Sequence, residues 1–108
     1  MRDMVKPRFA YLLLKEHPYG REMLRQILSE DFIPSIIITE NSEIADEERE
    51  KFLTRIDGNP IAPTISEQLS ELKEHGIDVP HIEVSIHNSE EVMPHIRNIP
   101  LDLIVFGG

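Results

Sequence analysis

The hexapeptide at 15–20 is the first segment whose residue types could do chemistry. It follows an apolar run and leads into a predicted helix, whose free N–H groups and dipole favour an anion. Lys15 and His17 could add positive charge, and Tyr19 and Gly20 complete a candidate substrate loop. The alternative is a simple connecting loop. The dinucleotide motif G-x-G-x-x-G is not predicted, because Gly20 is the one glycine of the segment.

The second candidate is the segment Leu101–Phe106 with the Gly107 and Gly108 that follow it. Its apolar residues predict a buried strand that runs into a Gly-Gly turn. In α/β proteins, the turn after such a strand is where ligands usually bind. Asp102 lies near the amino end of this strand, away from that turn, so we interpret it as a structural or solvated residue rather than a catalytic acid.

Metal binding and nucleophilic catalysis have little support in the sequence. The histidines fall in different elements without carboxylates at a zinc-site spacing, so we expect no metal. No serine lies in a G-x-S-x-G motif, and the chain has no cysteine. His75 and His95 are predicted near helix C-termini, where a cation is mildly favoured. The five histidines are His17, His75, His81, His87 and His95.

Composition indicates one folded, globular domain. The 108 residues are 40% hydrophobic and 29% charged. The net charge of -9 argues against a nucleic-acid surface, because such surfaces gather Lys and Arg. No apolar run approaches the roughly 18 residues that cross a bilayer, and the start lacks a secretory apolar region, so we expect a cytoplasmic protein. The acidic stretch 40–50 is either a solvated helix face or an acidic docking surface.

The first half of the chain predicts a strand, helix, strand unit. Apolar runs at Phe9–Leu14 and Ile33–Thr39 are typical of strands buried on two faces, and Arg21–Glu30 has helical spacing between them. Such a crossover makes the two strands parallel. Ser42 should cap a helix that ends near Ile56. Its candidate apolar side consists of Ile44, Phe52, Leu53 and Ile56.

The second half repeats this alternation. Thr64 and Glu67 form a capping box for an amphipathic helix that ends near Gly76, and a strand follows at about 81–85. A short helix capped by Asn88 or Ser89 comes next. Because Pro94 cannot donate a backbone hydrogen bond, that helix is either kinked or starts late. Its expected buried residues are Val92, Met93, Ile96 and Ile99, and the strand Leu101–Phe106 completes the pattern.

The alternation predicts an open Rossmann-like α/β fold: about four parallel strands in the order 3-2-1-4, with helices on both faces. In that order, the winding direction reverses between the first and the last strand, and a crevice should open at their carboxyl ends. The crevice would lie between Lys15–Gly20 and Phe106–Gly108.

These elements resemble the N-terminal part of the formyltransferase family, which includes methionyl-tRNA and phosphoribosylglycinamide formyltransferases. The likeness rests on the strand Phe9–Leu14, the helix with Met23, Leu24, Ile27 and Leu28, the strand Pro34–Ile38 and, above all, Pro100–Gly108. The last stretch is similar to the family's proline, spacer, aspartate, aliphatic strand and small-residue turn. The departure is at Leu14 and Lys15, where many members have a glycine.

The resemblance implies that Phe106, Gly107 and Gly108 line the pocket of a 10-formyltetrahydrofolate donor, and that Lys15–Gly20 faces an amine acceptor. The family's catalytic asparagine, the histidine of its His-Pro-x-Leu-Leu-Pro-like stretch and its aspartate would lie beyond Gly108. We therefore expect the N-terminal portion of a formyltransferase-like protein, shortened and inactive in this form.

The alternative is a stand-alone α/β module that binds a small ligand or a protein partner. A nucleotide-dependent oxidoreductase fragment is disfavoured because the glycine fingerprint is missing. In either case, the strand 101–106 would have one unpaired edge, so we also expect self-association through that edge.

Overall fold

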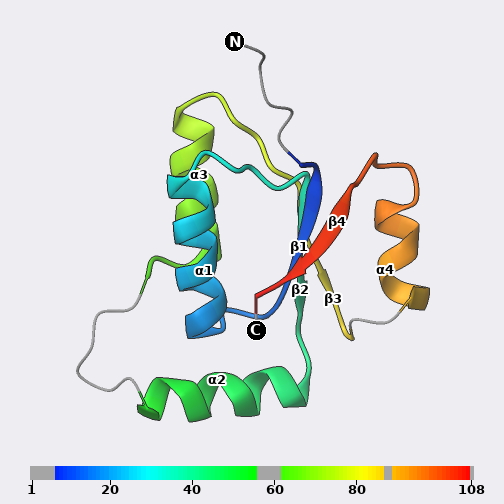
Figure 1. The fold of residues 1–108 in the computed structure, drawn as a ribbon. Coiled ribbons are helices and arrows are strands. Elements are labelled where there is room, and N and C mark those ends of the chain that lie inside the picture. The colour runs from blue at the N-terminus through cyan, green and yellow to red at the C-terminus, as the bar shows by residue number, and fades with distance from the viewer. Residues whose placement is uncertain (1–6, 56–61, 87–88, 108) are drawn as a thin grey trace.

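A computed structural model of the chain describes residues 7–55, 62–86 and 89–107. Strands and helices alternate in the described residues, and all strand pairs are parallel in the sheet order β3-β2-β1-β4 (Figure 1). The predicted fold class is therefore confirmed. The elements are β1 (Phe9–Leu14), α1 (Pro18–Ser29), β2 (Ile36–Glu40), α2 (Glu43–Arg55), α3 (Ile65–Glu74), β3 (His81–Val84), α4 (Ser89–Ile96) and β4 (Leu103–Phe106).

Each face of the sheet carries its own apolar core, because side chains alternate along a strand. On one face, Tyr11 and Ile37 pack in a cluster with Leu24 of α1 and Ile65 of α3. Figure 1 shows α4 on the opposite side from α1 and α3, while α2 lies at the end of the sheet. The opposite core joins the other residues of the strands to α4: Ala10, Leu12, Ile36, Ile38, Val84, Val92 and Ile96.

Three predicted boundaries are wrong, each for a local reason. Helix α1 begins at Pro18 instead of Arg21, since proline is well suited to the first helical position and His17 caps it. Strand β2 begins at Ile36, because Pro34 has no N–H to give to a ladder. Strand β4 begins at Leu103, since the amides of Asp102 and Leu103 both donate to the Arg8 carbonyl and interrupt the regular ladder. These distances are 2.7 and 3.3 Å.

The prediction of a buried last strand is wrong, because Leu103, Ile104 and Phe106 of β4 are 43%, 42% and 66% exposed. Two residues predicted for the apolar sides of helices are exposed as well. Ile44 of α2 is 62% exposed, and Ala45 is the buried residue of that turn. Met93 of α4 is 42% exposed, because the short helix buries the stripe of Val92 and Ile96, four residues apart. Pro94 lies inside α4, so the predicted alternative of a helix that starts near Pro94 is wrong. Ile56 and Asn88 lie outside the described residues.

The caps of α2 and α3 agree with the prediction. Ser42 Oγ accepts a hydrogen bond from the Ala45 amide at 3.2 Å. Thr64 and Glu67 form the reciprocal capping box, with both hydrogen bonds present. Gly76 follows α3 with φ of +81°, the left-handed conformation that glycine adopts without strain. These local signals fix where α2 begins and where α3 begins and ends.

Candidate functional site

The predicted loop and the predicted turn meet at the carboxyl ends of β1 and β4. The two backbones are so close that a Cβ placed on Gly20 would lie 3.1 Å from the Gly107 carbonyl oxygen. The same Cβ would lie 2.7 Å from Leu13 Cδ1. The Gly107 amide donates to the Leu12 carbonyl at 2.8 Å, which extends the β1–β4 ladder into the turn. Gly108 lies outside the described residues.

Tyr11 is the residue that sequence reasoning missed at this position. Its side chain is fully buried, and Oη donates a hydrogen bond to the Gly20 carbonyl oxygen at 2.7 Å. A Cβ on Gly107 would overlap the Tyr11 hydroxyl and ring, so the turn fits here because residue 107 has no side chain. Burial raises the pKa of the Tyr11 hydroxyl above its usual range, which keeps this group a neutral donor. Tyr11 thus holds the start of α1 against the β4 turn.

His17 is a helix cap rather than a cationic group. Its Nδ1 accepts a hydrogen bond from the Tyr19 amide at 3.2 Å, and its side chain is buried. The rings of His17 and Tyr19 each lie 4.6 Å, centroid to centroid, from the ring of Phe52 on α2. Burial lowers the pKa of His17, and the nearby Glu48 only partly opposes this shift. The expected positive charge of His17 is therefore wrong near neutral pH.

Lys15 is directed toward β3 rather than toward β4. Its Nζ lies 3.2 Å from Glu83 Oε1. The Arg49 guanidinium of α2 donates to the Lys15 carbonyl oxygen at 3.3 Å. Of the four residues predicted to form the substrate loop, the structure thus brings Gly20 to the β4 turn. The other three contact Glu83 or the α2 residue Phe52.

Glu16 links the same loop to α3. Its backbone has φ of +51°, which is unusual for a residue other than glycine. Its Oε1 accepts a hydrogen bond from the Ile65 amide at 3.1 Å and lies 3.1 Å from Arg21 Nε. A carboxylate at the first amide of a helix is favoured by the helix dipole. Glu16 therefore binds three elements together at the carboxyl edge of the sheet.

Acidification should destabilise the protein through His17. The unfolded chain takes up a proton near pH 6.5, while burial lowers the pKa of the folded His17, so protonation favours unfolding. The contribution is complete above pH 6.5 and is lost as the pH falls toward the folded pKa. Each unit between the two pKa values is worth about 1.4 kcal/mol of unfolding free energy. Denaturant melts between pH 7 and 5 measure the loss.

The variant His17→Asn isolates this effect, because asparagine still caps a helix but does not titrate. Its unfolding free energy should fall less steeply with pH than that of the unaltered protein. Desolvation lowers the pKa of His81 as well, so part of the slope remains. His75→Asn, at the exposed C-cap of α3, is the control. An identical slope in His17→Asn would contradict the neutral state of the buried His17.

Asp102 lies at the amino end of β4, as expected. Its Oδ2 accepts a hydrogen bond from the Arg8 amide at 2.8 Å, and Arg8 also pairs with it through the guanidinium. These hydrogen bonds hold the pKa of Asp102 below its usual range. It is exposed, and its pairing with Arg8 joins the residues that immediately precede β1 and β4. Its role is therefore structural.

The other histidines that the structure describes lie in different elements. His75 is the C-cap of α3 and His95 lies in the last turn of α4, as predicted. His81 Nε2 lies 3.3 Å from Thr39 Oγ1 on the neighbouring strand. His87 lies outside the described residues. Within 7–55, 62–86 and 89–107, no group of three or more His, Cys, Asp or Glu side chains could hold a metal ion.

No helix among the described residues has the length and apolar character needed to cross a bilayer. No protein-family model, curated protein or solved structure matches this chain.

Proposed function

We propose that this chain is the N-terminal portion of a formyltransferase-like protein, and that it does not transfer a formyl group in this form. In this proposal a 10-formyltetrahydrofolate donor contacts the β4 turn at Phe106 and Gly107, with Gly108 following. An amine acceptor approaches from the side of Gly20. Folate-dependent one-carbon metabolism in the cytoplasm is the setting that the proposal implies.

The observation that carries this proposal is the contact between Gly20 and Gly107 at the carboxyl ends of β1 and β4. In open α/β sheets, ligands bind outside the carboxyl ends of the strands where the winding reverses, and β1 and β4 are the strands on either side of that reversal. Because Gly20 and Gly107 have no side chains, the two backbones face each other directly at this point. The strand sequence that resembles the formyltransferase family, Pro100–Gly108, supplies one of them.

Catalysis is not assigned to any residue of this chain. Formyl transfer needs protonatable groups and a stabilised oxyanion beside the reacting carbon. At this edge Tyr11 is a buried donor already bonded to Gly20, and His17 is a buried cap. Lys15 is paired with Glu83. The described residues therefore supply a binding wall, and the catalytic groups of the family would have to come from elsewhere.

A folate titration followed by amide NMR tests the proposal. With 5-formyltetrahydrofolate as the probe, the amide signals of Gly20, Phe106 and Gly107 should shift in a saturable manner. Phe106→Ala removes a side chain that is 66% exposed and should weaken binding. Ile44→Ala, at a similarly exposed position on α2, should not. Absence of shifts at the β1–β4 edge would reject the folate site.

An activity assay tests the other half of the proposal. The purified chain, incubated with 10-formyltetrahydrofolate and an amine acceptor, should release no tetrahydrofolate above the uncatalysed background. Formyl transfer by this chain would contradict the expected inactivity. The donor concentration is set above the dissociation constant measured by NMR, so that an absence of turnover is not an absence of binding.

The second candidate is a stand-alone binding or protein-interaction module. Helix α2 favours it, because that helix lies at the end of the sheet and presents an acidic surface around the exposed Ile44 (Figure 1). A basic partner peptide would then shift the amide signals of α2, whereas a folate would not. The same NMR spectra therefore separate the two candidates. The acidic residues of α2 are Glu43, Asp46, Glu47, Glu48 and Glu50.

A further inference from the structure

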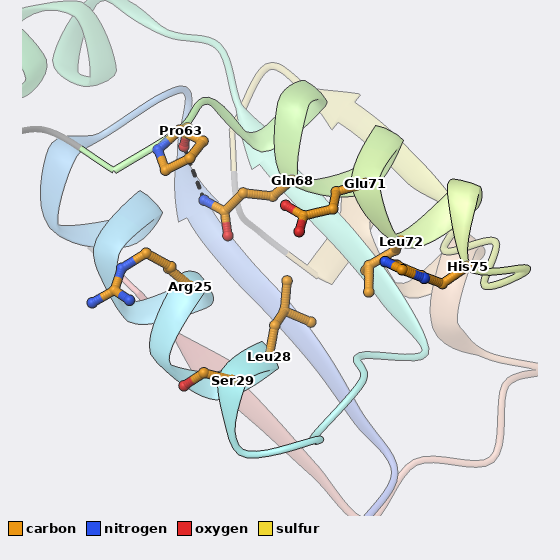
Figure 2. Close-up of a pocket in the computed structure, with 8 residues that line it drawn as sticks. All are labelled: Arg25, Leu28, Ser29, Pro63, Gln68, Glu71, Leu72 and His75. Carbon is orange, nitrogen blue, oxygen red and sulfur yellow. Dashed lines mark hydrogen bonds between the residues drawn. The ribbon is translucent and has the colours of Figure 1, made fainter.

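A cavity of about 320 Å³ lies between α1 and α3, separate from the β1–β4 edge. Figure 2 shows its walls: Leu28 comes from α1, Leu72 comes from α3, and Pro63 lies just before α3. The volume is at the lower end of the range for small-molecule sites, about 300–1,000 Å³. The cavity therefore has room for a compact organic ligand with an apolar body.

Gln68 leaves a buried acceptor in this cavity without a partner. The side chain is only 5% exposed, and Nε2 donates to the Pro63 carbonyl at 2.9 Å and the Arg21 carbonyl at 3.1 Å. Because both partners are carbonyl oxygens, which can only accept, the Gln68 atom that faces them must be the amide nitrogen. Its Oε1 is buried and has no hydrogen-bond partner among the described residues. Figure 2 shows the oxygen turned away from Pro63, into the space near Leu28 and Arg25.

The other polar groups of the cavity also favour a donor ligand. The Glu71 carboxylate stands beside Gln68 on the same wall (Figure 2). Arg25 adds little positive charge, because Glu22 pairs with its guanidinium through both carboxylate oxygens. Ser29 Oγ donates to the Gln26 carbonyl at 2.7 Å, so its hydroxyl proton is already used within α1. The cavity thus offers the Gln68 acceptor and the Glu71 carboxylate over an apolar floor, and its one guanidinium is already paired.

We propose that this cavity binds a small organic cation, an ammonium or guanidinium group carried on a compact apolar body. The N–H groups of the cation satisfy Gln68 Oε1 and pair with the Glu71 carboxylate. The apolar body packs between Leu28 and Leu72. A buried acceptor that lacks a partner is costly, so a ligand that donates to it gains more than it would at an exposed site. The chain's net charge of -9 further favours a cation.

Amide NMR titration with benzylammonium tests this site directly. We expect saturable shifts of the Leu28 and Leu72 amides and of the Gln68 side-chain NH₂ signals. Benzyl alcohol has the same ring without the charge and should bind more weakly, and benzoate should not bind. If water alone satisfies Gln68 Oε1, benzylammonium produces no saturable shifts in these signals, and the proposal is overturned.

Two charge-neutralising variants of α3 separate this site from general attraction to an acidic protein. Glu71→Gln should weaken benzylammonium binding by about three- to tenfold, the value of one typical net hydrogen bond, because Glu71 is partly solvated. Glu74→Gln removes the same charge one turn further along α3, outside the cavity lining, and should change affinity less than twofold. Equal weakening by both variants would overturn the proposal. Both positions are exposed, so neither variant should disturb the fold.

Discussion

Gly107→Ala is expected to lower the unfolding free energy by about 1 to 3 kcal/mol, the range for overpacking a well-filled site. The new Cβ would overlap the hydroxyl and ring of Tyr11, which is itself fully buried and hydrogen-bonded to Gly20. Either the β4 turn moves away from β1, or the Tyr11 ring gives up its hydrogen bond. Chemical denaturation of the two proteins measures the difference.

Two comparisons identify the origin of this loss. Gly76→Ala also replaces a glycine, but its Cβ would meet no atom within 4 Å. Its cost, about 1 kcal/mol, comes from the left-handed backbone alone. Tyr11→Phe alone should cost about 1 to 3 kcal/mol, because the Gly20 carbonyl loses its buried donor.

The double variant of Tyr11→Phe and Gly107→Ala decides the mechanism. The two substitutions should be less than additive, since Tyr11→Phe removes the atom that the new methyl group meets most closely. Full additivity would contradict a direct steric contact between the two residues. The result bears on function, because the same contact holds the proposed ligand edge together.

Self-association through β4 is the second large effect that we expect. Within the described residues β4 pairs with β1 on one side, and nothing pairs with its other edge. The Leu103 and Gly107 amides point toward β1, so the Ile104 and Phe106 amides between them point to the open edge. The strand is also apolar and exposed: Leu103 is 43%, Ile104 42% and Phe106 66% exposed. Such an edge is a template for pairing with another chain.

An apolar hollow beside β4 adds to this surface. It has a volume of about 210 Å³ and lies between Phe9, Phe32 and the β4 residues Leu103 and Val105. Side chains of a second copy could bury themselves there once the two edges pair. Light scattering should therefore give a mass that rises above that of the monomer, 12.5 kDa, as concentration increases.

Phe106→Lys should return the protein to the monomer, because a lysine on an edge strand opposes pairing. Ile44→Lys is the matched control: it places the same charge at a position 62% exposed on α2, away from the edge. It should leave the mass unchanged. A clean monomer for the unaltered protein at high concentration would argue against pairing through β4, as would equal dissociation in both variants.

Much of the fold follows from short-range patterns. The continuous apolar run Phe9–Leu14 matches β1 at both ends, because a strand buried on two faces contains few polar positions. The Thr64 and Glu67 capping box marks the start of α3 for a similarly local reason. The predictions that Ile44 and Met93 are buried are wrong. Helical spacing identifies an apolar stripe on the helix surface, but it does not say which edge of that stripe faces the core. That depends on how the helix is docked.

For the candidate site, too, one part could be predicted from the sequence and another part could not. The position of the proposed ligand edge, between β1 and β4, could be predicted, since the alternation of strands and helices favours the Rossmann-like order 3-2-1-4 and the reversal point follows from that order. The charge of the loop 15–20 could not be predicted from the sequence. His17 could add positive charge by residue type alone, but burial against Phe52 and its capping hydrogen bond favour the neutral ring. Lys15 was expected at the ligand edge, yet Glu83 on a non-neighbouring strand holds it elsewhere.

The sequence by itself determined the alternating elements and their caps, because each depends on residues within a few positions of one another. Only the tertiary structure decided that Tyr11 meets Gly20 and Gly107, and that Gln68 leaves an acceptor open between α1 and α3. Both arrangements join residues from different elements. Close packing and hydrogen-bond geometry become defined only when those elements dock.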